Sequence, residues 1–348
     1  MQIFILFVFL FFVSIFSTFI YSLPTVGDKG RELHYFIGAH DILWDYAPST
    51  KVNMMGDVFP HANDTIRNRT LYYQYMDETF LERIYLENPS HGDLGPVIRA
   101  NVFDTIHVHF WNNASTSVSI HPHGVLYEFK DDGSMIGTSP GMKTTIIWQV
   151  PERAGPVNGN NFTLWAYHSH VNERDIYRGL MGPIVIYKEG YIIDESHPQE
   201  FFLKSIVDVY GNEKNENEKE IEEDSSNVVE MFSINGYIYG NVPEITIPLD
   251  STAIWHLLSF GDEIDIHAMH WHGNVVTLLD GKNVDVVTLF PGSFETAIMK
   301  PDSIGRWMYH CHVMEHFEMG MYMHYIVTVS RLKMGLQKKT NYKTVFTE

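Results

Sequence analysis

Short runs of alternating hydrophobic and polar positions dominate the chain from residue 31 onward. Valine, isoleucine, threonine, tyrosine and phenylalanine are common in these runs, and glycine, proline, asparagine and aspartate separate them. Alternation over so few residues is typical of β-strands that bury one face, and few segments are long enough for a helix. We therefore predict an all-β fold of two β-sandwiches. The clearest predicted strands are residues 105–111 and 182–187 in the first sandwich and residues 200–210, 253–258 and 321–329 in the second.

The length and composition of the chain agree with two domains. A chain of 348 residues, 45% of them hydrophobic, has room for two separate cores. We place the first domain at residues 23–190 and the second at residues 191–330, with the join near residues 189–197. Residues 212–226 are predicted to form an exposed acidic loop in the second domain, and residues 331–348 a polar C-terminal tail.

The N-terminus is almost continuously apolar from Ile3 to Ile20. Residues 1–22 therefore predict a secretory signal peptide, and with it a secreted, extracellular protein. No lysine or arginine precedes the apolar run, and its length approaches that of a membrane span, so a retained membrane anchor is the alternative. Four Asn-x-Ser/Thr sequons, which fit a glycoprotein, begin at Asn63, Asn68, Asn113 and Asn161.

Charge and cysteine content narrow the function. The chain has 43 acidic and 24 basic side chains, a formal net charge of -19, which argues against nucleic acid and anionic membrane surfaces as partners. It favours cations near the surface instead. A secreted chain normally pairs its thiols, but this one has a single cysteine, Cys311. An unpaired thiol in an oxidising compartment indicates a chemical role.

Histidine pairs of the form His-x-His recur in both halves of the chain. In a strand, residues two apart project from the same face, so each pair offers two imidazoles side by side. Neutral imidazole is a good ligand for copper, zinc and iron, so eight imidazoles predict a polynuclear metal centre. The pairs are His121 with His123 and His168 with His170 in the first half, and His270 with His272 and His310 with His312 in the second.

Cys311 lies between two of these histidines, so its thiol must point to the opposite face of the strand. His267 precedes the pair at 270 and 272 by an odd number of positions and can face the same side, and His316 and Met321 follow the cysteine closely. Two imidazoles, one thiolate and a weak axial thioether are the ligand set of a blue-copper electron-transfer centre. One strand would then serve two metal sites, one on each face.

These motifs, together with RELHYFIGAHDILWDYAPS at residues 31–49 and HCHVMEHFEMGM at residues 310–321, resemble the multicopper oxidases of the ceruloplasmin and hephaestin type. The cupredoxin domains of that family also occur in coagulation factors V and VIII. The resemblance covers nearly all of the mature chain. It implies two cupredoxin-like Greek-key β-sandwich domains and an oxidase that reduces O2 to water with electrons from a substrate.

The resemblance also implies a ligand for each copper. One type 1 copper, one type 2 copper and two type 3 coppers are expected per active unit. The expected ligands are His267, Cys311, His316 and Met321 for type 1, His121 and His270 for type 2, His123, His168 and His312 for one type 3 ion, and His170, His272 and His310 for the other. No cysteine occurs in the first half of the chain, so that domain cannot hold a blue copper.

The electron donor is less clear from the sequence. Glu315 falls where the ceruloplasmin-type ferroxidases have an acidic iron ligand, which favours ferrous iron as the substrate. The family's histidine and glutamate before the second-domain Asn-Gly turn fall here on Phe232 and Asn227, which cannot replace them. The nearby acids Glu222, Glu223, Asp224 and Glu230 are candidates to substitute. The alternative is a laccase-like oxidase of phenols or amines, with the acids forming a solvated loop.

Two other classes of protein share features of this sequence. A non-catalytic copper-binding or adhesion module has the same fold, but the complete ligand set argues against it. A copper nitrite reductase also has two cupredoxin domains, but its catalytic copper needs only three histidines. His107-Val108-His109 is a further His-x-His segment, which we expect to be a solvated or hydrogen-bonded pair because no glycine turn follows it.

A homotrimer with copper clusters between subunits is the predicted assembly. In the six-domain relatives the three-copper cluster lies between the first and last domains, which ring closure brings together. If the covalent join in this chain resembles a sequential join in that ring, its own two sets of histidines face apart. A head-to-tail contact with neighbouring chains would then complete each cluster. A monomer folded back on itself is the alternative.

Overall fold

The computed structural model describes residues 30–50, 65–85, 88–134, 136–191, 199–210 and 229–329, together with positions 52, 56 and 58. Four predicted segments lie outside the described residues: the signal peptide, residues 192–197 of the join, the acidic loop at 212–226 and the C-terminal tail. The domain boundary at residue 190 therefore stays a prediction. Among the described residues no helix is long and apolar enough to span a membrane.

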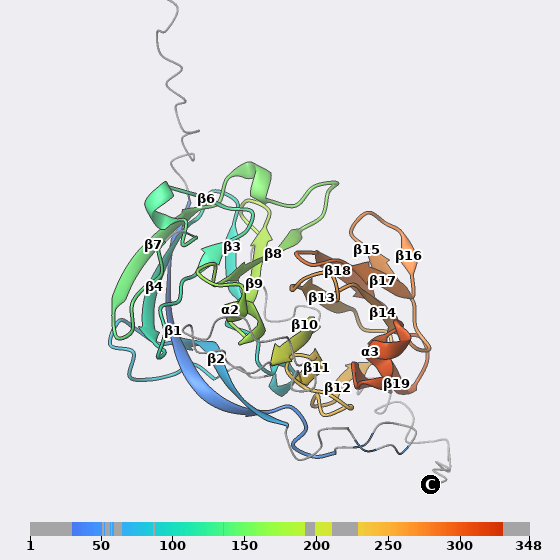
Figure 1. Cartoon of the computed structure of the whole chain (residues 1–348). Coiled ribbons are helices and arrows are strands. Elements are labelled where there is room, and N and C mark those ends of the chain that lie inside the picture. The colour runs from blue at the N-terminus through green and yellow to red at the C-terminus, as the bar shows by residue number, and fades with distance from the viewer. Residues whose placement is uncertain are drawn as a thin grey trace, which may run out of the picture.

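The described chain forms a first unit from residues 30–191 and a second unit from residues 199–329, seen side by side in Figure 1. The strands of the first unit are β1 Glu32–Asp45, β2 Ile66–Tyr75, β3 Ile98–Asn101, β4 Thr105–Asn113, β5 His121–Pro122, β6 Leu126–Tyr127, β7 Lys143–Gln149, β8 Phe162–His168 and β9 Met181–Tyr187. Those of the second unit are β10 Gln199–Tyr210, β11 Val229–Ile234, β12 Ile245–Pro248, β13 Ala253–Ser259, β14 His267–Trp271, β15 Val276–Leu278, β16 Asn283–Val284, β17 Val286–Leu289, β18 Phe294–Met299, β19 Gly305–Cys311 and β20 Tyr322–Thr328. The helices are α2 Arg174–Tyr177 and α3 Met314–Glu318, and the 3-10 turns are η1 Pro89–His91, η2 Phe129–Asp131 and η3 Glu152–Ala154. The prediction of an all-β fold is confirmed, and the five predicted strands match β4, β9, β10, β13 and β20 within two residues at each end.

The two units repeat one pattern of strand pairing. In the first unit β1 runs antiparallel to β2 and parallel to β4, and in the second unit β10 runs antiparallel to β11 and parallel to β13. In the facing sheets, β8 lies between β5 and β9 as β19 lies between β14 and β20. Each sheet takes its strands from one unit. The duplication inferred from the paired histidines is therefore also a duplication of topology.

Each unit buries its own apolar core between its two sheets. The sequence of buried and exposed residues along a strand depends on whether one or both faces of that strand are covered. In β4, Ile106, Val108 and Phe110 are completely buried, while the residues between them face outward. In β13 every residue is buried, because the strand lies between its own core and the first unit. A strand covered on both faces has a continuous rather than alternating apolar pattern. That is why residues 253–258 contain so few polar positions.

The two units pack directly on one another. Leu94, Leu164 and Val185 of the first unit form one apolar cluster with Ile206 and Leu258 of the second. A second contact is made by the end of β1, which runs out from the first unit in Figure 1. There the indole N–H of Trp44 donates to the carbonyl oxygen of Gly236 at 2.6 Å. Packing over two separate areas fixes the orientation of one unit on the other.

Four charged side chains are completely buried where the units meet. In the first unit, Arg69 lies 2.8 Å from Asp93. Two residues of the second unit join them: Asp208 lies 3.1 Å from Arg69, and Lys204 contacts Asp93. Burial opposes the charge on Asp93, but Lys204 and Arg69 hold its pKa below the ordinary value. Burial raises the pKa of Asp208 despite the same two cations. The network joins the units by charges that water cannot screen.

Candidate metal centres

A buried group of one thiol and two imidazoles lies in the core of the second unit. His267 at the start of β14, Cys311 at the end of β19 and His316 on α3 offer ligand atoms that lie within 4.8 Å of one another. The two Nδ1 atoms of the histidines are 3.1 Å apart, and the Cys311 sulfur is 3.5 Å from Nδ1 of His316. Three buried, converging donor atoms at these distances could bind a single metal ion.

Backbone contacts hold this group in place. The amide of Ala268 donates to the Cys311 sulfur at 3.4 Å, which favours a thiolate. Burial nevertheless raises the pKa of the Cys311 thiol, so a metal ion is needed to keep the sulfur ionised near neutral pH. Met321 is completely buried in the same core, and its amide and carbonyl groups are bonded to His316 and Cys311. This placement fits the predicted axial thioether.

The four predicted histidines of the first unit lie together at the ends of β5 and β8. His121 and His168 are register partners, and the Nε2 atoms of His123 and His168 are 3.0 Å apart. The ring of His170 lies 5.0 Å from that of His121. Nδ1 of His121 donates to the carbonyl oxygen of Asp132, and Nδ1 of His168 donates to that of Ser169. In this tautomer the lone pair on Nε2 of each ring is the one that could bind a metal ion.

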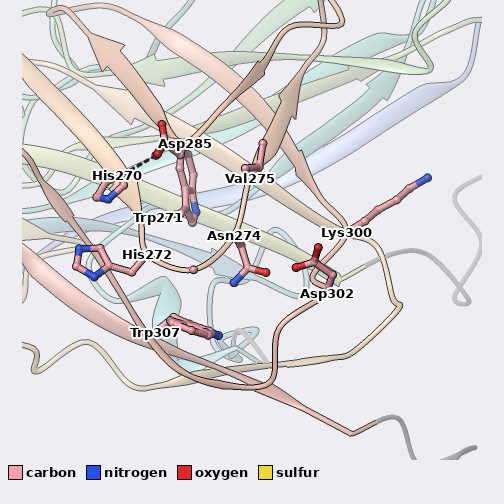
Figure 2. A pocket seen from close by; sticks show the side chains of 10 residues that line it. His270, Trp271, His272, Asn274, Val275, Asp285, Lys300, Asp302 and Trp307 are labelled. Carbon is pink, nitrogen blue, oxygen red and sulfur yellow. Dashed lines mark hydrogen bonds between the residues drawn. The ribbon is translucent and has the colours of Figure 1, made fainter.

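The second unit repeats this arrangement at the ends of β14 and β19. His270 and His310 are register partners, and the Nε2 atoms of His272 and His310 are 3.1 Å apart. Nδ1 of His270 is bonded to the carbonyl oxygen of Asp285, as Figure 2 shows, and Nδ1 of His310 to that of Cys311. His312 lies 5.6 Å from the ring of His270. The two groups of four histidines therefore have equivalent positions in the two units.

Burial keeps several of these imidazoles neutral. It lowers the pKa of His123, His310 and His316 to about 4 and that of His168 to about 3, with neighbouring histidines adding to the effect. A neutral ring has a free lone pair, which a metal ion needs. His123, His168, His310 and His316 could therefore bind a metal ion at neutral pH without first losing a proton.

Each unit holds its own group of histidines. The histidines of the first unit and of the second unit fall into separate groups of potential ligands. His123 and His168 face phenylalanines of the second unit instead, with His123 5.1 Å from Phe294 and His168 5.4 Å from Phe260. The second half opens on a cleft of about 660 Å³ lined by His270, His272, Asn274, Val275 and Trp307, among others (Figure 2). Among the described residues, the two groups therefore do not share ligand atoms.

Glu315 lies exposed on α3, directly before His316. It interacts with Glu230 on β11, whose pKa is raised by burial and by the charges of Glu315 and Asp262. Tyr177 of the first unit is bonded to Asp262. The sequence pattern named Glu315 and Glu230, but it missed Asp262 and Tyr177, because their approach depends on how the units pack. Asn227 and the acids at 222–224 lie outside the described residues.

Phe232, at the position where the ferroxidase pattern has histidine, packs its ring 5.1 Å from that of His316. A phenylalanine side chain has no atom that can bind a metal ion, so Phe232 packs against His316 without adding a ligand. His107 and His109, which we expected to be a hydrogen-bonded or solvated pair, do have partners, since His107 contacts Glu32 and His109 lies 3.1 Å from Thr145 Oγ1.

Two β-sandwiches, a buried Cys-His-His group and two groups of four histidines define a two-domain protein of cupredoxin-like fold. The chain belongs to the multicopper oxidase family: residues 91–190 and residues 210–331 each match a family model described as multicopper oxidase. The family implies copper as the metal. The donors fit copper, because a buried thiolate with imidazoles suits a soft-to-borderline ion.

Relatives in this family are moderately similar. Mouse hephaestin is 33% identical over 88% of this chain, and a human protein named ferroxidase HEPHL1 is 32% identical over 84%. The chain spans 30% and 29% of the lengths of these two relatives. A solved structure titled multicopper oxidase mgLAC has a TM-score of 0.61 at 19% identity, over 89% of this chain and 92% of that one. At such identity the structural likeness shows the fold.

Proposed function

We propose that this protein is an oxidase that couples four one-electron oxidations of a substrate to the reduction of O2 to water. The observation that carries the proposal is the placement of Cys311 and His310 next to each other on β19. The thiol belongs to the buried Cys-His-His group, and the neighbouring imidazole belongs to a polynuclear half-site. Copper bound at these positions would supply one-electron redox chemistry. The covalent chain between them is a short connection from one site to the other.

The proposed ligands follow the two kinds of site. His267, Cys311 and His316, with Met321 as the axial group, would hold one type 1 copper. The eight paired histidines would hold one type 2 and two type 3 coppers once two halves meet. Carbonyl bonds to Nδ1 of His121, His168, His270 and His310 support this proposal, because they fix the tautomer in which Nε2 is the ligand.

Ferrous iron is the electron donor that the surface above His316 favours. There the charges of Glu315 and Asp262 both act on Glu230, and this repulsion would fall if a cation bound beside Glu230. Carboxylate oxygens are hard ligands that suit Fe²⁺ and Fe³⁺ better than a phenol or an amine. Glu315 would hold the iron beside His316. Similarity to the human ferroxidase HEPHL1 agrees with this choice.

Oxidation of phenols or amines is the second candidate, and one experiment separates the two. Glu315→Gln and the matched control Glu318→Gln, on the same helix, should be assayed for O2 consumption with Fe²⁺ and with a bulky phenol. We expect Glu315→Gln to lower kcat/KM for Fe²⁺ at least tenfold and to leave the phenol rate within twofold, while the control changes neither. Equal losses on both substrates, or no loss on either, would contradict the iron role.

A homotrimer is the proposed assembly, because each half-site is incomplete in one chain. The open cleft beside His270 and His272 has room for an approaching surface. Val275 on its rim is 57% exposed, and Ile136, near the loop that supports His121, is 84% exposed. Apolar residues exposed beside both half-sites support a contact between chains. Repetition of that head-to-tail contact with closure would give three clusters in a ring of three chains.

Secretion is proposed from residues 1–22, with membrane anchoring by the same residues as the alternative. The described sequon asparagines support passage through a glycosylating compartment, because Asn68, Asn113 and Asn161 are all exposed. A secreted form would meet O2 and extracellular iron directly. Sequencing the N-terminus of the purified protein would distinguish a cleaved leader from a retained anchor.

A further inference from the structure

Three histidines lie together on the outer face of the first unit, away from both half-sites. His34 on β1 and His107 on β4 are register partners on neighbouring parallel strands, and His109 lies two residues further along β4. The intervening residues of β4, Ile106 and Val108, are completely buried. Residues that alternate with buried positions face the opposite side of a sheet, so all three imidazoles project outward.

The three rings are in contact with one another. Nδ1 of His34 lies 3.0 Å from Nε2 of His109, and the ring of His34 stacks on that of His107 at 4.7 Å between centroids. A carboxylate completes the group, because Glu32 contacts Nε2 of His107. Thr145 Oγ1 lies 3.1 Å from Nδ1 of His109, which orients that ring with Nε2 toward His34. The strand pairing thus brings together donors that are 73 or more residues apart in sequence.

The contact between His34 and His109 has close parallels in the described chain. Ring nitrogens of two histidines approach within hydrogen-bond distance at four places there. Three of them are pairs proposed above as copper ligands: His123 with His168 at 3.0 Å, His267 with His316 at 3.1 Å, and His272 with His310 at 3.1 Å. The fourth is His34 with His109 at 3.0 Å. The spacing that marks the metal sites therefore recurs outside them.

We propose that His34, His107 and His109, with Glu32, form a surface site for one divalent transition-metal ion of the Cu²⁺ or Zn²⁺ class. Imidazole with one carboxylate suits these borderline ions, and Cu²⁺ binds such donors more tightly than Zn²⁺. The rings of His34 and His109 are within 16° of parallel, as in a single N–H···N hydrogen bond. A metal ion would take the place of the proton shared by His34 and His109 when the exposed His34 ring tilts. Rotation of the His107 side chain would then bring a third ring nitrogen to the ion.

This site is distinct from the proposed oxidase centres and does not depend on them. A negatively charged chain attracts cations to its surface, and a histidine cluster converts that general attraction into a defined site. The site would take up an ion without occupying the buried thiol or the half-sites. Its occupancy should therefore leave the colour and turnover of the oxidase unchanged.

Zn²⁺ titrated calorimetrically into the copper-loaded protein tests the proposal, because zinc has no redox chemistry and no colour of its own. We expect one equivalent to bind the wild type and the control His324→Gln, whose histidine on β20 contacts the ring of Tyr322. His34→Ala and His109→Ala should each weaken that binding at least tenfold, with His107→Gln as an independent third variant. Blue colour and O2 consumption, unchanged in all, show that the variants are folded. Absence of zinc binding to the wild type, or equal affinity in all variants, would overturn the site.

Discussion

Ser169 in the first unit takes the place that Cys311 takes in the second. Each follows a histidine whose Nδ1 is bonded to its carbonyl oxygen, at 2.7 Å for His168 with Ser169 and 2.8 Å for His310 with Cys311. The hydroxyl of Ser169 donates to the buried carboxylate of Asp175 at 2.6 Å, whereas the sulfur of Cys311 faces His316. The duplicated strand therefore carries paired histidines in both units but a thiol beside His316 in only one.

Replacement of Cys311 by serine is expected to abolish the blue absorption and the oxidase activity. Charge transfer from sulfur to oxidised copper causes that colour, and the chain has no second thiol. Absorption spectroscopy of the copper-loaded variant checks the outcome. Ser169→Ala is the matched control, and it should keep the full colour. A blue Cys311→Ser protein would refute the assignment.

Replacement of both His123 and His170 by alanine should leave the blue colour and stop O2 consumption. These residues belong to the first-unit half-site, and Cys311 with its partner histidines lies in the core of the other unit. Oxygen-electrode turnover and absorption spectra on one sample measure the two effects together. Turnover at the wild-type rate would show that the paired histidines are not needed for the reaction.

Mixing two inactive variants tests the trimer. One variant lacks His121 and His123, the other lacks His270 and His272, and the two are dissociated and reassembled together. In a head-to-tail ring some contacts would join an intact first unit to an intact second unit, so part of the activity should return. A monomer folded back on itself has no such contact and would remain inactive. The size of the wild type in solution, measured by light scattering, gives an independent answer.

Acid should weaken the contact between the units through Glu200. Burial opposes its charge, but the partners His256 and Arg99 lower its pKa from 4.5 to about 2. The folded-state pKa lies below the ordinary one, so the stabilisation is complete above about pH 4.5 and is lost as the pH falls toward 2. A shift of this size corresponds to roughly 3 kcal/mol at neutral pH.

Glu200→Gln should therefore lower the free energy of unfolding at pH 7 and flatten its decline between pH 4.5 and 2. Urea unfolding at several pH values measures both effects. Glu244→Gln is the control, because Glu244 pairs with Arg306 at an exposed position within the second unit. An acid profile identical to that of the wild type would rule out this role for Glu200.

The two buried carboxylates should differ in their contribution to stability. The cations hold Asp93 ionised, whereas burial raises the pKa of Asp208, which also accepts from Tyr46 at 2.8 Å. Asp93→Asn removes a negative charge that Arg69 and Lys204 share, and should lower the free energy of unfolding by about 3 to 5 kcal/mol. Burial makes the charge of Asp208 less favourable than that of Asp93, so Asp208→Asn should cost less than Asp93→Asn. Chemical denaturation gives both values, and a larger loss for Asp208→Asn would contradict the ranking.

Sequence reasoning was most successful where the chemistry is local. Alternation of apolar residues located the strands, and the spacing around Cys311 predicted which side chains share a face. Both follow from the two-residue period of a strand. The sequence could also tell that the first half has no cysteine, so that the two repeats differ in function.

The features that the sequence did not reveal depend on contacts between distant segments. His34 joins His107 and His109 only because β1 pairs in parallel with β4. Tyr177 reaches Asp262 only because the first unit packs on the second. Neither contact has a periodic signature, since parallel pairing and domain packing are set by the whole core rather than by neighbouring residues.

The buried charges at the junction of the units have a consequence for how the chain folds. Asp93 is bonded to a cation from each unit, and Arg69 to an anion from each unit. A separated unit would expose the apolar residues that pack against the other unit. Its buried charged side chains would also lose the ion pairs that they make with the other unit. Neither half is then a self-sufficient folding module, although each has its own sandwich and core. Scanning calorimetry should consequently record one cooperative heat-absorption peak for the chain, and fragments cut near residue 190 should aggregate unless they are refolded together.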